Sequence, residues 1–295
     1  MQEVLDQNRF KIIYSHAVTS ELINSCSCLT VSKGAADEAP AIISAYSAEN
    51  TAAVWDYRRK RIKAGLTVVD IRTSAYSEPE IVWANLYTDT VVWEIKKEGY
   101  SWKAYQRPHA MGRPMIEPLV YRPSLDRPFG KSRISRAVMS ITDSAVRTSL
   151  RAEVSSEFFT APQKYVLGAN EEMFKDGKWE AYIGNWLALT KDEDGDTPHL
   201  GQLTQGSMQP HTDYMRSLAS RFSGETSIPI SELGVISDSP SSAQAIYAAK
   251  ESLLVEAESL NDTNGEALKV IGQMAIAIIK GIPYACARTQ VGIPL

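Results

Sequence analysis

Apolar residues recur at three- and four-residue steps from Ser132 to Phe159, and most charged residues of this segment lie between them. This pattern predicts an amphipathic helix of roughly 40 Å, since each residue adds about 1.5 Å. Its apolar face is expected to comprise Ile134, Ala137, Val138, Ile141, Ala145 and Val154. A shorter helix is predicted over His211 to Ser223, with an apolar side at Tyr214, Met215, Leu218, Ala219 and Phe222.

Two further helices are predicted from capping and breaking residues. Asn50 to Gly65 has a capping residue, helix-forming residues and a terminal glycine, so it is predicted to be helical. Ser239 as a cap and Pro240 at the first helical position open a helix that runs through Leu260. Asn264-Gly265 is predicted to break it before a last apolar helix.

Strands are predicted in the first third of the chain. Leu66 to Arg72 and Ile81 to Tyr87 are rich in Val, Ile and Trp. Thr90 to Ile95 and Tyr100 to Tyr105 flank Lys97-Glu98-Gly99, which predicts a hairpin.

Three segments interrupt these patterns. Prolines in Arg107 to Phe129 break every regular pattern, so this connector is predicted to mark a change of subdomain. Ala161 to Ser207 is predicted to be a small strand-rich insertion. Gly224 to Ser239 contains Pro229 and Gly234 and is predicted to be an irregular loop.

Composition narrows the class of protein. The 295 residues are 44% hydrophobic with a formal net charge of -4, which excludes an intrinsically disordered chain and a chain-wide basic surface. Three cysteines, Cys26, Cys28 and Cys286, fit a reducing compartment such as bacterial cytoplasm. The N-terminus lacks the order of a signal peptide, and Val270 to Ala287 is too polar to cross a membrane, so we expect a soluble protein.

The sequence contains few signs of catalysis. It has no G-x-S-x-G elbow, Walker A loop or G-x-G-x-x-G run, and its four histidines have no partner at catalytic or metal-ligand spacing. We therefore predict no enzyme activity, no cofactor and no metal site. The basic run from Arg58 to Lys63 is interpreted as the solvated face of a helix, and Asp192 to Asp196 as an acidic turn.

Several segments in the second half resemble one viral family. RPFGKSRI, from Arg127 to Ile134, opens the long helix with a Gly-x-Ser element. GETSIPISELG, from Gly224 to Gly234, contains I-P-x-x-x-L-G, and DSPSSAQAIYAAKE begins at Asp238. Together these segments resemble the portal proteins of long-tailed, siphovirus-like bacteriophages, and the resemblance covers Arg127 to Leu260.

The resemblance implies an α+β fold in which successive segments of the chain form different structural parts. Residues 1–131 would form a strand-rich wing, 132–159 a stem helix, 160–207 a small α/β clip and 208–223 a second stem helix. Residues 224–240 would form a tunnel loop, and 241–295 the long helices of the wing and crown base. Family members are usually longer at both ends, so we expect a truncated portal that alone forms monomers or weak oligomers.

The family also implies a function and partners. Portal proteins form a ring, usually of twelve subunits, at one capsid vertex, and double-stranded DNA passes through it non-specifically during packaging and ejection. The ring would be assembled in the bacterial cytoplasm, remain in the virion, and contact the terminase large subunit, the head-tail adaptor, and capsid and scaffolding proteins, with no membrane.

Two sets of site residues follow from the resemblance. The expected tunnel-loop residues facing DNA are Glu225, Ser227, Ser231, Glu232, Ser237 and Asp238. The expected clip docking surface comprises Lys175, Asp176, Lys178 and Trp179. Two alternatives stay open: another phage structural protein such as a minor head protein, or a nucleic-acid enzyme using Glu171, Glu172 and Asp176.

Overall fold

The computed structural model describes residues 2–74, 77–160, 164–167, 199–202, 207–234 and 243–287. The chain divides into two units, one comprising Met1–Ser135 with Glu251–Leu295 and the other comprising Arg136–Lys250. Both units contain helices and antiparallel strands. The mixed helix and sheet content confirms the predicted α+β class at this coarse level.

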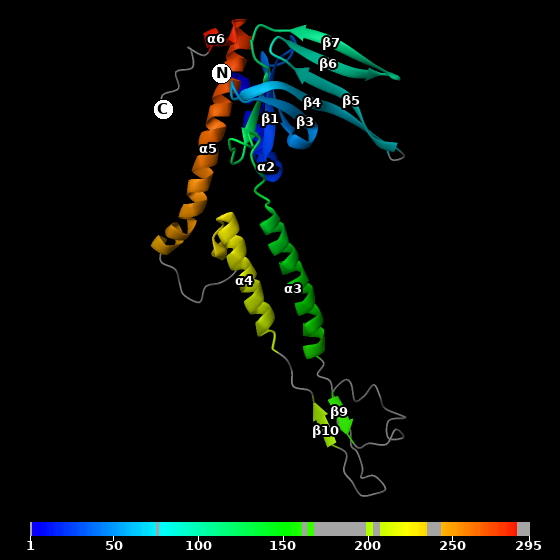
Figure 1. Cartoon of the computed structure of the whole chain (residues 1–295), viewed down its shortest axis with the longest axis vertical. Coiled ribbons are helices and arrows are strands. Elements are labelled where there is room, and N and C mark those ends of the chain that lie inside the picture. Colours follow the sequence, from blue (N-terminus) through cyan, green and yellow to red (C-terminus); the bar gives the residue numbers. More distant parts are fainter. Residues whose placement is uncertain are drawn as a thin grey trace. The chain divides into compact units, whose positions relative to one another are not determined.

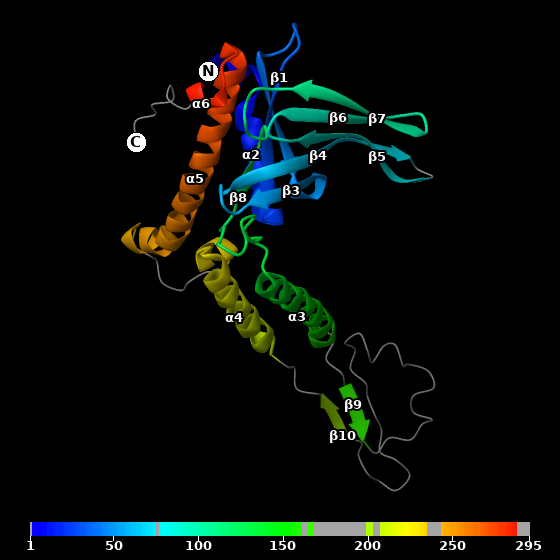
Figure 2. The same cartoon turned by 45° about the horizontal axis from the view of Figure 1, so that its top comes forward.

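A three-stranded antiparallel sheet forms the centre of the first unit. Its order is β2 (Ala41–Ser47), β1 (Cys26–Lys33) and β8 (Ile116–Val120). Figures 1 and 2 show helix α2 (Phe10–Asn24) alongside β1, and the C-terminal part of α5 (Ala243–Lys280) near the same sheet. Fully buried side chains of these elements form one core, which includes Leu29, Val31, Ile116, Leu119, Ile271 and Met274. Burying such apolar surface is the main force that holds this unit together.

Short elements surround this core. Helix α1 (Gln2–Gln7) precedes α2, and the 3-10 helix η1 (Ala48–Asn50) follows β2. Helix α6 (Tyr284–Ala287) follows α5. No helix is predicted from the sequence in the first 24 residues. Helix α2 has only Ala17 and Glu21 fully buried and so lacks a clear apolar stripe.

A five-stranded antiparallel meander completes the first unit. Its strands follow the chain order β3 (Thr51–Asp56), β4 (Arg61–Ser74), β5 (Ser77–Tyr87), β6 (Val91–Glu98) and β7 (Ser101–Pro108). The strands predicted at Leu66 to Arg72 and Ile81 to Tyr87 are confirmed, as is the hairpin around Gly99. Gly99 has φ 64°, a left-handed conformation that suits the tight turn between β6 and β7.

The helix predicted from Asn50 to Gly65 is wrong. This segment contains β3, a turn and the start of β4. Asp56 Oδ1 accepts hydrogen bonds from the backbone N–H groups of Arg58 and Arg59, both at 3.0 Å, which favours a turn over a helix. A Cβ on Gly65 would lie 3.0 Å from the Ile116 side chain, so the glycine permits close packing of β4 against β8 instead of ending a helix.

The proline-rich connector was also interpreted wrongly in part. Strand β8 lies inside Arg107 to Phe129 and contains Pro118, which is aligned with Cys28 of β1. Because β8 is at the edge of its sheet, the missing N–H of Pro118 need not interrupt a ladder on both sides. The connector therefore contributes to the core, and the boundary between the two units falls later, after Ser135.

Helix α5 continues through Asn264-Gly265, where a break was predicted. Asn264 is fully buried, and its side-chain amide donates a 2.9 Å hydrogen bond to the Glu21 carboxyl of α2. Beyond Gly265, Ala267 and Ile271 pack into the core. Gly costs a helix only about 1 kcal/mol relative to Ala, and this packing outweighs that preference.

The second unit is dominated by two helices. They are α3 (Arg136–Thr160) and α4 (Gln209–Thr226), which pack against each other. Between them in sequence, β9 (Lys164–Leu167) pairs antiparallel with β10 (His199–Gln202). The 3-10 helix η3 (Ile230–Leu233) follows α4. The helices predicted at Ser132 to Phe159 and His211 to Ser223 are confirmed with shifted ends.

Candidate functional site

The entry to α3 is the first segment on which the resemblance to portal proteins depends. Gly130 has φ 72°, and a Cβ on it would lie 2.1 Å from the backbone oxygen of Tyr121. The adjacent Lys131 N–H donates a 3.0 Å hydrogen bond to that same oxygen. No other residue fits at position 130 without moving this backbone, so the glycine is explained by packing.

Ser132 and Arg133 continue this entry by capping helix α2. The Ser132 hydroxyl donates to the Ile23 carbonyl at 2.5 Å, and the Arg133 N–H donates to the Leu22 carbonyl at 2.9 Å. The last carbonyl groups of a helix have no hydrogen-bond donor within the helix. Ser132 and Arg133 provide donors for two of these carbonyl groups in α2. The Gly-x-Ser element thus fastens the chain to the end of α2 just before α3 begins.

Glu256 of α5 adds an ionic contact to the same region. Its carboxylate is 3.1 Å from Arg122 Nη2 and 3.7 Å from Arg133 Nη2, and it also accepts a hydrogen bond from the Tyr121 hydroxyl. The Glu256 side chain is only 10% exposed. Burial together with the Glu256 carboxylate raises the pKa of Tyr121 to about 12, so this hydroxyl stays protonated and can donate.

The packed faces of α3 and α4 follow helical spacing. On α3, Ile141 and Thr148 are 6% and 3% exposed. Val138 and Ala145, which lie on the same side of the helix, are half-buried. On α4, Leu218 is 2% exposed. Ser155 Oγ and His211 Nε2 form a hydrogen bond of 3.2 Å between the two helices. The prediction for α3 is thus confirmed at its middle, whereas Ile134, Ala137 and Val154 are exposed.

A second apolar stripe on α3 lies outside this packed face. Met139, Val146, Leu150 and Val154 are 49%, 56%, 62% and 54% exposed. Their spacing places them within about 80° of one another around the helix at 3.6 residues per turn. An aligned row of exposed apolar side chains is typical of a surface that contacts another protein.

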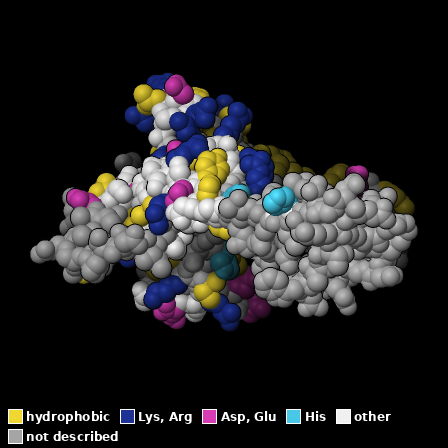
Figure 3. All heavy atoms as spheres, turned by 90° about the horizontal axis from the view of Figure 1, so that it is seen from below, with side chains coloured by type: hydrophobic (Ala, Val, Ile, Leu, Met, Phe, Trp, Pro, Cys, Tyr) yellow, Lys and Arg dark blue, Asp and Glu magenta, His cyan; other side chains and the backbone are white. Residues whose placement is uncertain are grey.

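The charges of the helical pair are balanced. Helices α3 and α4 together carry five Arg residues and five Asp or Glu residues. Figure 3 shows basic, acidic and apolar side chains interspersed on the visible part of the described surface. The helical pair therefore has no strong field of one sign with which to hold a phosphate backbone.

The predicted tunnel loop begins later than expected. Gly224, Glu225 and Thr226 form the last turn of α4, so this part of the predicted loop is wrong. The Thr226 hydroxyl donates to the Phe222 carbonyl at 2.8 Å, and Ser227 ends the helix at φ 59°. Glu225 is thus an exposed helical residue.

The next residues form the compact element η3. Pro229 precedes it, and Gly234 ends it at φ 75°. Ser231 and Glu232 are exposed, and Glu232 Oε1 lies 2.8 Å from Lys250 Nζ. The hydrogen bond from Lys250 lowers the pKa of Glu232, so this carboxylate is ionised and paired. Ser237 and Asp238 lie outside the described residues.

The other predicted site residues cannot be placed. Lys175, Asp176, Lys178 and Trp179 of the expected docking surface lie outside the described residues, as do Glu171 and Glu172 of the enzyme alternative. Within the described ranges, no three metal-ligating side chains come together. In the same part of the chain, none of the helices combines the length and apolarity needed to cross a bilayer.

Comparison with known proteins identifies relatives. No family model matches the chain. The chain is 29% identical over 210 residues to the portal protein of Mycobacterium phage D29, and equally to that of Mycobacterium phage L5. Each match covers 68% of this chain and 42% of the phage protein, so the chain matches less than half of the length of these relatives. This agrees with the resemblance noted over Arg127 to Leu260: the chain is similar to bacteriophage portal proteins.

Proposed function

We propose that copies of this chain form part of a ring at one capsid vertex, through which double-stranded DNA is packaged and ejected. The similarity to two phage portal proteins carries this proposal. A portal has a structural role, so the proposal includes no catalytic step. The ring, its vertex and the passage of DNA are proposals, since the matched relatives are longer than the matched region.

The parts of the fold suit the division that the resemblance implies. In the proposal, α3 and α4 are the stem helices, and the first unit is the wing with the base of the crown. Strands β9 and β10 pair with each other between the two helices, so the intervening insertion begins and ends at the same place. This arrangement supports a clip formed by the insertion.

The exposed stripe of α3 supports association of copies. Met139, Val146, Leu150 and Val154 would pack against the stem of a neighbouring subunit. Burying an apolar side chain of this size contributes about 1.5–3 kcal/mol, and in a closed ring every subunit would gain it. The stripe therefore gives the proposal a specific interface to test.

Sedimentation velocity of the 295-residue chain over a range of concentrations tests this interface. The wild-type chain should associate as concentration rises, and electron microscopy of the larger species should show rings or arcs. Leu150→Glu should abolish association without lowering the melting temperature, because Leu150 is 62% exposed. Arg147→Gln is the matched control on the same helix. Association of the wild-type chain that Leu150→Glu leaves unchanged would contradict the proposed interface.

The balanced charge of the helical pair supports passage of DNA without adhesion. Long stretches of unpaired Lys or Arg would bind phosphates tightly and slow translocation. The segment from Ser227 to Ser239, the proposed tunnel loop, contains no Lys or Arg. Its Glu232 is paired with Lys250, so its contribution to repulsion is smaller than the sequence suggests.

Shortening Ser227 to Val235 to a Gly-Ser linker in the full-length protein tests the tunnel-loop assignment. In the proposal, the altered protein still folds and assembles, but infectious particles package or retain less DNA. The control is Glu232→Gln with Lys250→Gln, which removes the ion pair and keeps the length of the segment. Normal packaging by the shortened protein would mean that the segment is only a connector.

The remaining partners belong to the same proposal. The clip, with Lys175, Asp176, Lys178 and Trp179, would dock the terminase large subunit and later the head-tail adaptor. Capsid and scaffolding proteins would contact the wing. Cross-linking mass spectrometry of assembled particles would test each contact separately.

A further inference from the structure

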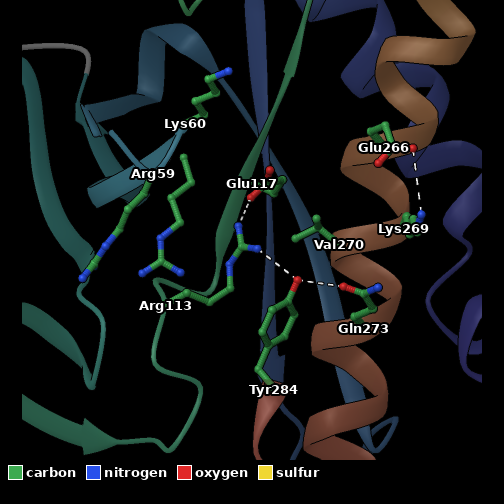
Figure 4. A pocket seen from close by; sticks show the side chains of 10 residues that line it. Arg59, Lys60, Arg113, Glu117, Glu266, Lys269, Val270, Gln273 and Tyr284 are labelled. Carbon is green, nitrogen blue, oxygen red and sulfur yellow. Dashed lines mark hydrogen bonds and ion pairs between the residues drawn. The ribbon is translucent and has the colours of Figure 1, made fainter. Parts of the chain in front are cut away.

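The first unit contains a basic pocket of about 690 Å³ that the portal proposal does not use. Figure 4 shows side chains that line it from the turn between β3 and β4, from β8 and the segment before it, and from helices α5 and α6. Five of the lining side chains are basic and two are acidic. They are Arg59, Lys60, Arg61, Arg113 and Lys269, and Glu117 and Glu266.

The basic side chains on the pocket's rim are loosely paired. Arg59 Nη1 and Arg61 Nη2 lie 3.5 Å and 3.6 Å from the Asp89 carboxylate, farther than an ordinary charged hydrogen bond. Arg61 Nη2 also donates a 3.2 Å hydrogen bond to the Gly112 carbonyl, which leaves the other N–H groups of this guanidinium available. Lys269 Nζ lies 4.0 Å from Glu266 Oε1. Among the described residues, Lys60 has no hydrogen bond or ion pair. These groups retain N–H donors that a ligand could use.

Arg113 is the buried basic residue of the pocket, and several contacts fix its guanidinium group. It is only 6% exposed, forms an ion pair with Glu117, and donates from Nη1 to the Tyr284 hydroxyl at 3.1 Å. Tyr284 in turn donates to Gln273 Oε1 at 2.7 Å, and Figure 4 shows this chain of contacts. Among the described residues, Arg113 Nε is buried without a hydrogen-bond partner, so one N–H of this guanidinium remains unsatisfied.

We propose that this pocket binds a phosphate-type oxyanion, either inorganic phosphate or the phosphate group of a small monoester. A carboxylate has two oxygens in one plane and is satisfied by a single guanidinium fork. The donors here come from several walls of one cavity, which suits a tetrahedral group with more acceptors and up to two negative charges. Asp56 and Asp89 beside the arginines offset part of the basic charge, which favours one bound group over a polyanion.

Duplex DNA fits this pocket less well. Its phosphates are spaced along a convex backbone, and binding them requires basic side chains along an extended surface. The five basic residues here surround a single cavity instead. The inference does not depend on the portal proposal, because the pocket lies within the first unit and uses none of the residues assigned to the DNA channel.

Isothermal titration of the 295-residue chain with inorganic phosphate, at constant ionic strength in sodium chloride, tests the site. The pocket variant combines Lys60→Asn, which suits the φ of 50° at this position, with Lys269→Gln. The control combines Lys33→Asn with Lys131→Gln, two exposed lysines that do not line the pocket. Phosphate should bind the wild type and the control alike, and the pocket variant about tenfold more weakly.

Other probes separate the ligand classes. Phenyl phosphate should compete with phosphate, whereas triglutamate and a 20-base-pair duplex should not. Absence of saturable phosphate binding, or equal weakening in the control variant, would overturn the site. Tighter binding of triglutamate or duplex, lost in the pocket variant, would overturn the ligand class. Phosphate binding that persists in Leu150→Glu would support a site independent of assembly.

Discussion

The buried pair Glu21 and Asn264 makes the stability of the first unit depend on pH. Glu21 is fully buried, and its only hydrogen-bond donor among the described residues is the Asn264 amide at 2.9 Å. Burial raises the pKa of Glu21 to about 7. Within the described part of the chain, Glu21 Oε1 and Asn264 Oδ1 both lack a hydrogen-bond partner. A proton on the carboxyl would remove the buried charge and could bridge these two acceptors.

The sign and size of the effect follow from this shift. The folded pKa of about 7 lies above the ordinary glutamate pKa of 4.5, so the folded state binds the proton more tightly. The resulting stabilisation is complete below about pH 4.5 and is lost as pH rises through 7. The difference between these two pKa values corresponds to about 3.5 kcal/mol, at about 1.4 kcal/mol for each pKa unit.

Glu21→Gln tests this linkage, because glutamine has nearly the same shape and cannot ionise. At pH 8 the variant should be more stable than the wild type by about 3 kcal/mol or slightly more, and at pH 4.5 the two should be nearly equal. Hydrogen exchange of β1 amides, such as those of Leu29 and Val31, reports on this unit alone. Exposed Glu3→Gln is the control. A difference between Glu21→Gln and the wild type that is the same at every pH would refute the reasoning.

Three further changes have clear expected outcomes. Ile141→Asp should cost roughly 3 kcal/mol or more and lower the melting temperature, since it buries a charge on a 6% exposed position, while Arg147→Gln should change stability by less than about 0.5 kcal/mol. Gly130→Ala should destabilise the chain by at least about 2 kcal/mol in urea titration, since its Cβ would meet the Tyr121 carbonyl oxygen, and an unchanged midpoint would contradict the observed packing. Purified protein with Mg²⁺ should neither cleave DNA nor hydrolyse ATP, and cleavage abolished by Glu172→Gln would favour the enzyme alternative.

Local sequence patterns were sufficient where packing follows a simple period. The helical spacing of Val138, Ile141 and Ala145 predicted the buried face of α3, and the turn at Gly99 predicted the hairpin of β6 and β7. In these places the residues that determine the element are close in the sequence. Local preference and tertiary packing therefore agree.

Elsewhere the deciding contacts come from distant segments. Gly65 packs against Ile116, and Asn264 bonds to Glu21, which is 243 residues away. When only sequence neighbours are considered, Gly65 and Gly265 both look like residues that end a helix. The prediction failed at both positions because tertiary contacts overrode local propensity.

The oxyanion pocket was missed for the same reason. Arg59, Arg113, Lys269 and Tyr284 belong to four separate segments, and none has a ligand-binding spacing in the sequence. The only local signal was the basic run from Arg58 to Lys63. That run was assigned to a helix, which would have distributed its charges around a cylinder, whereas a tight turn gathers three of them at one cavity.

The segments that carry the resemblance to portal proteins are explained by folding before any contact with DNA is considered. Only glycine fits at position 130, where the chain lies against the Tyr121 backbone, and Ser132 caps α2. In the second segment, Pro229 precedes η3 and Gly234 ends it in a left-handed conformation. Such residues identify an architecture, because each satisfies a backbone requirement that another residue would violate. The resemblance therefore supports how this chain folds, and variants of the exposed stripe, the loop and the pocket test which of its side chains act.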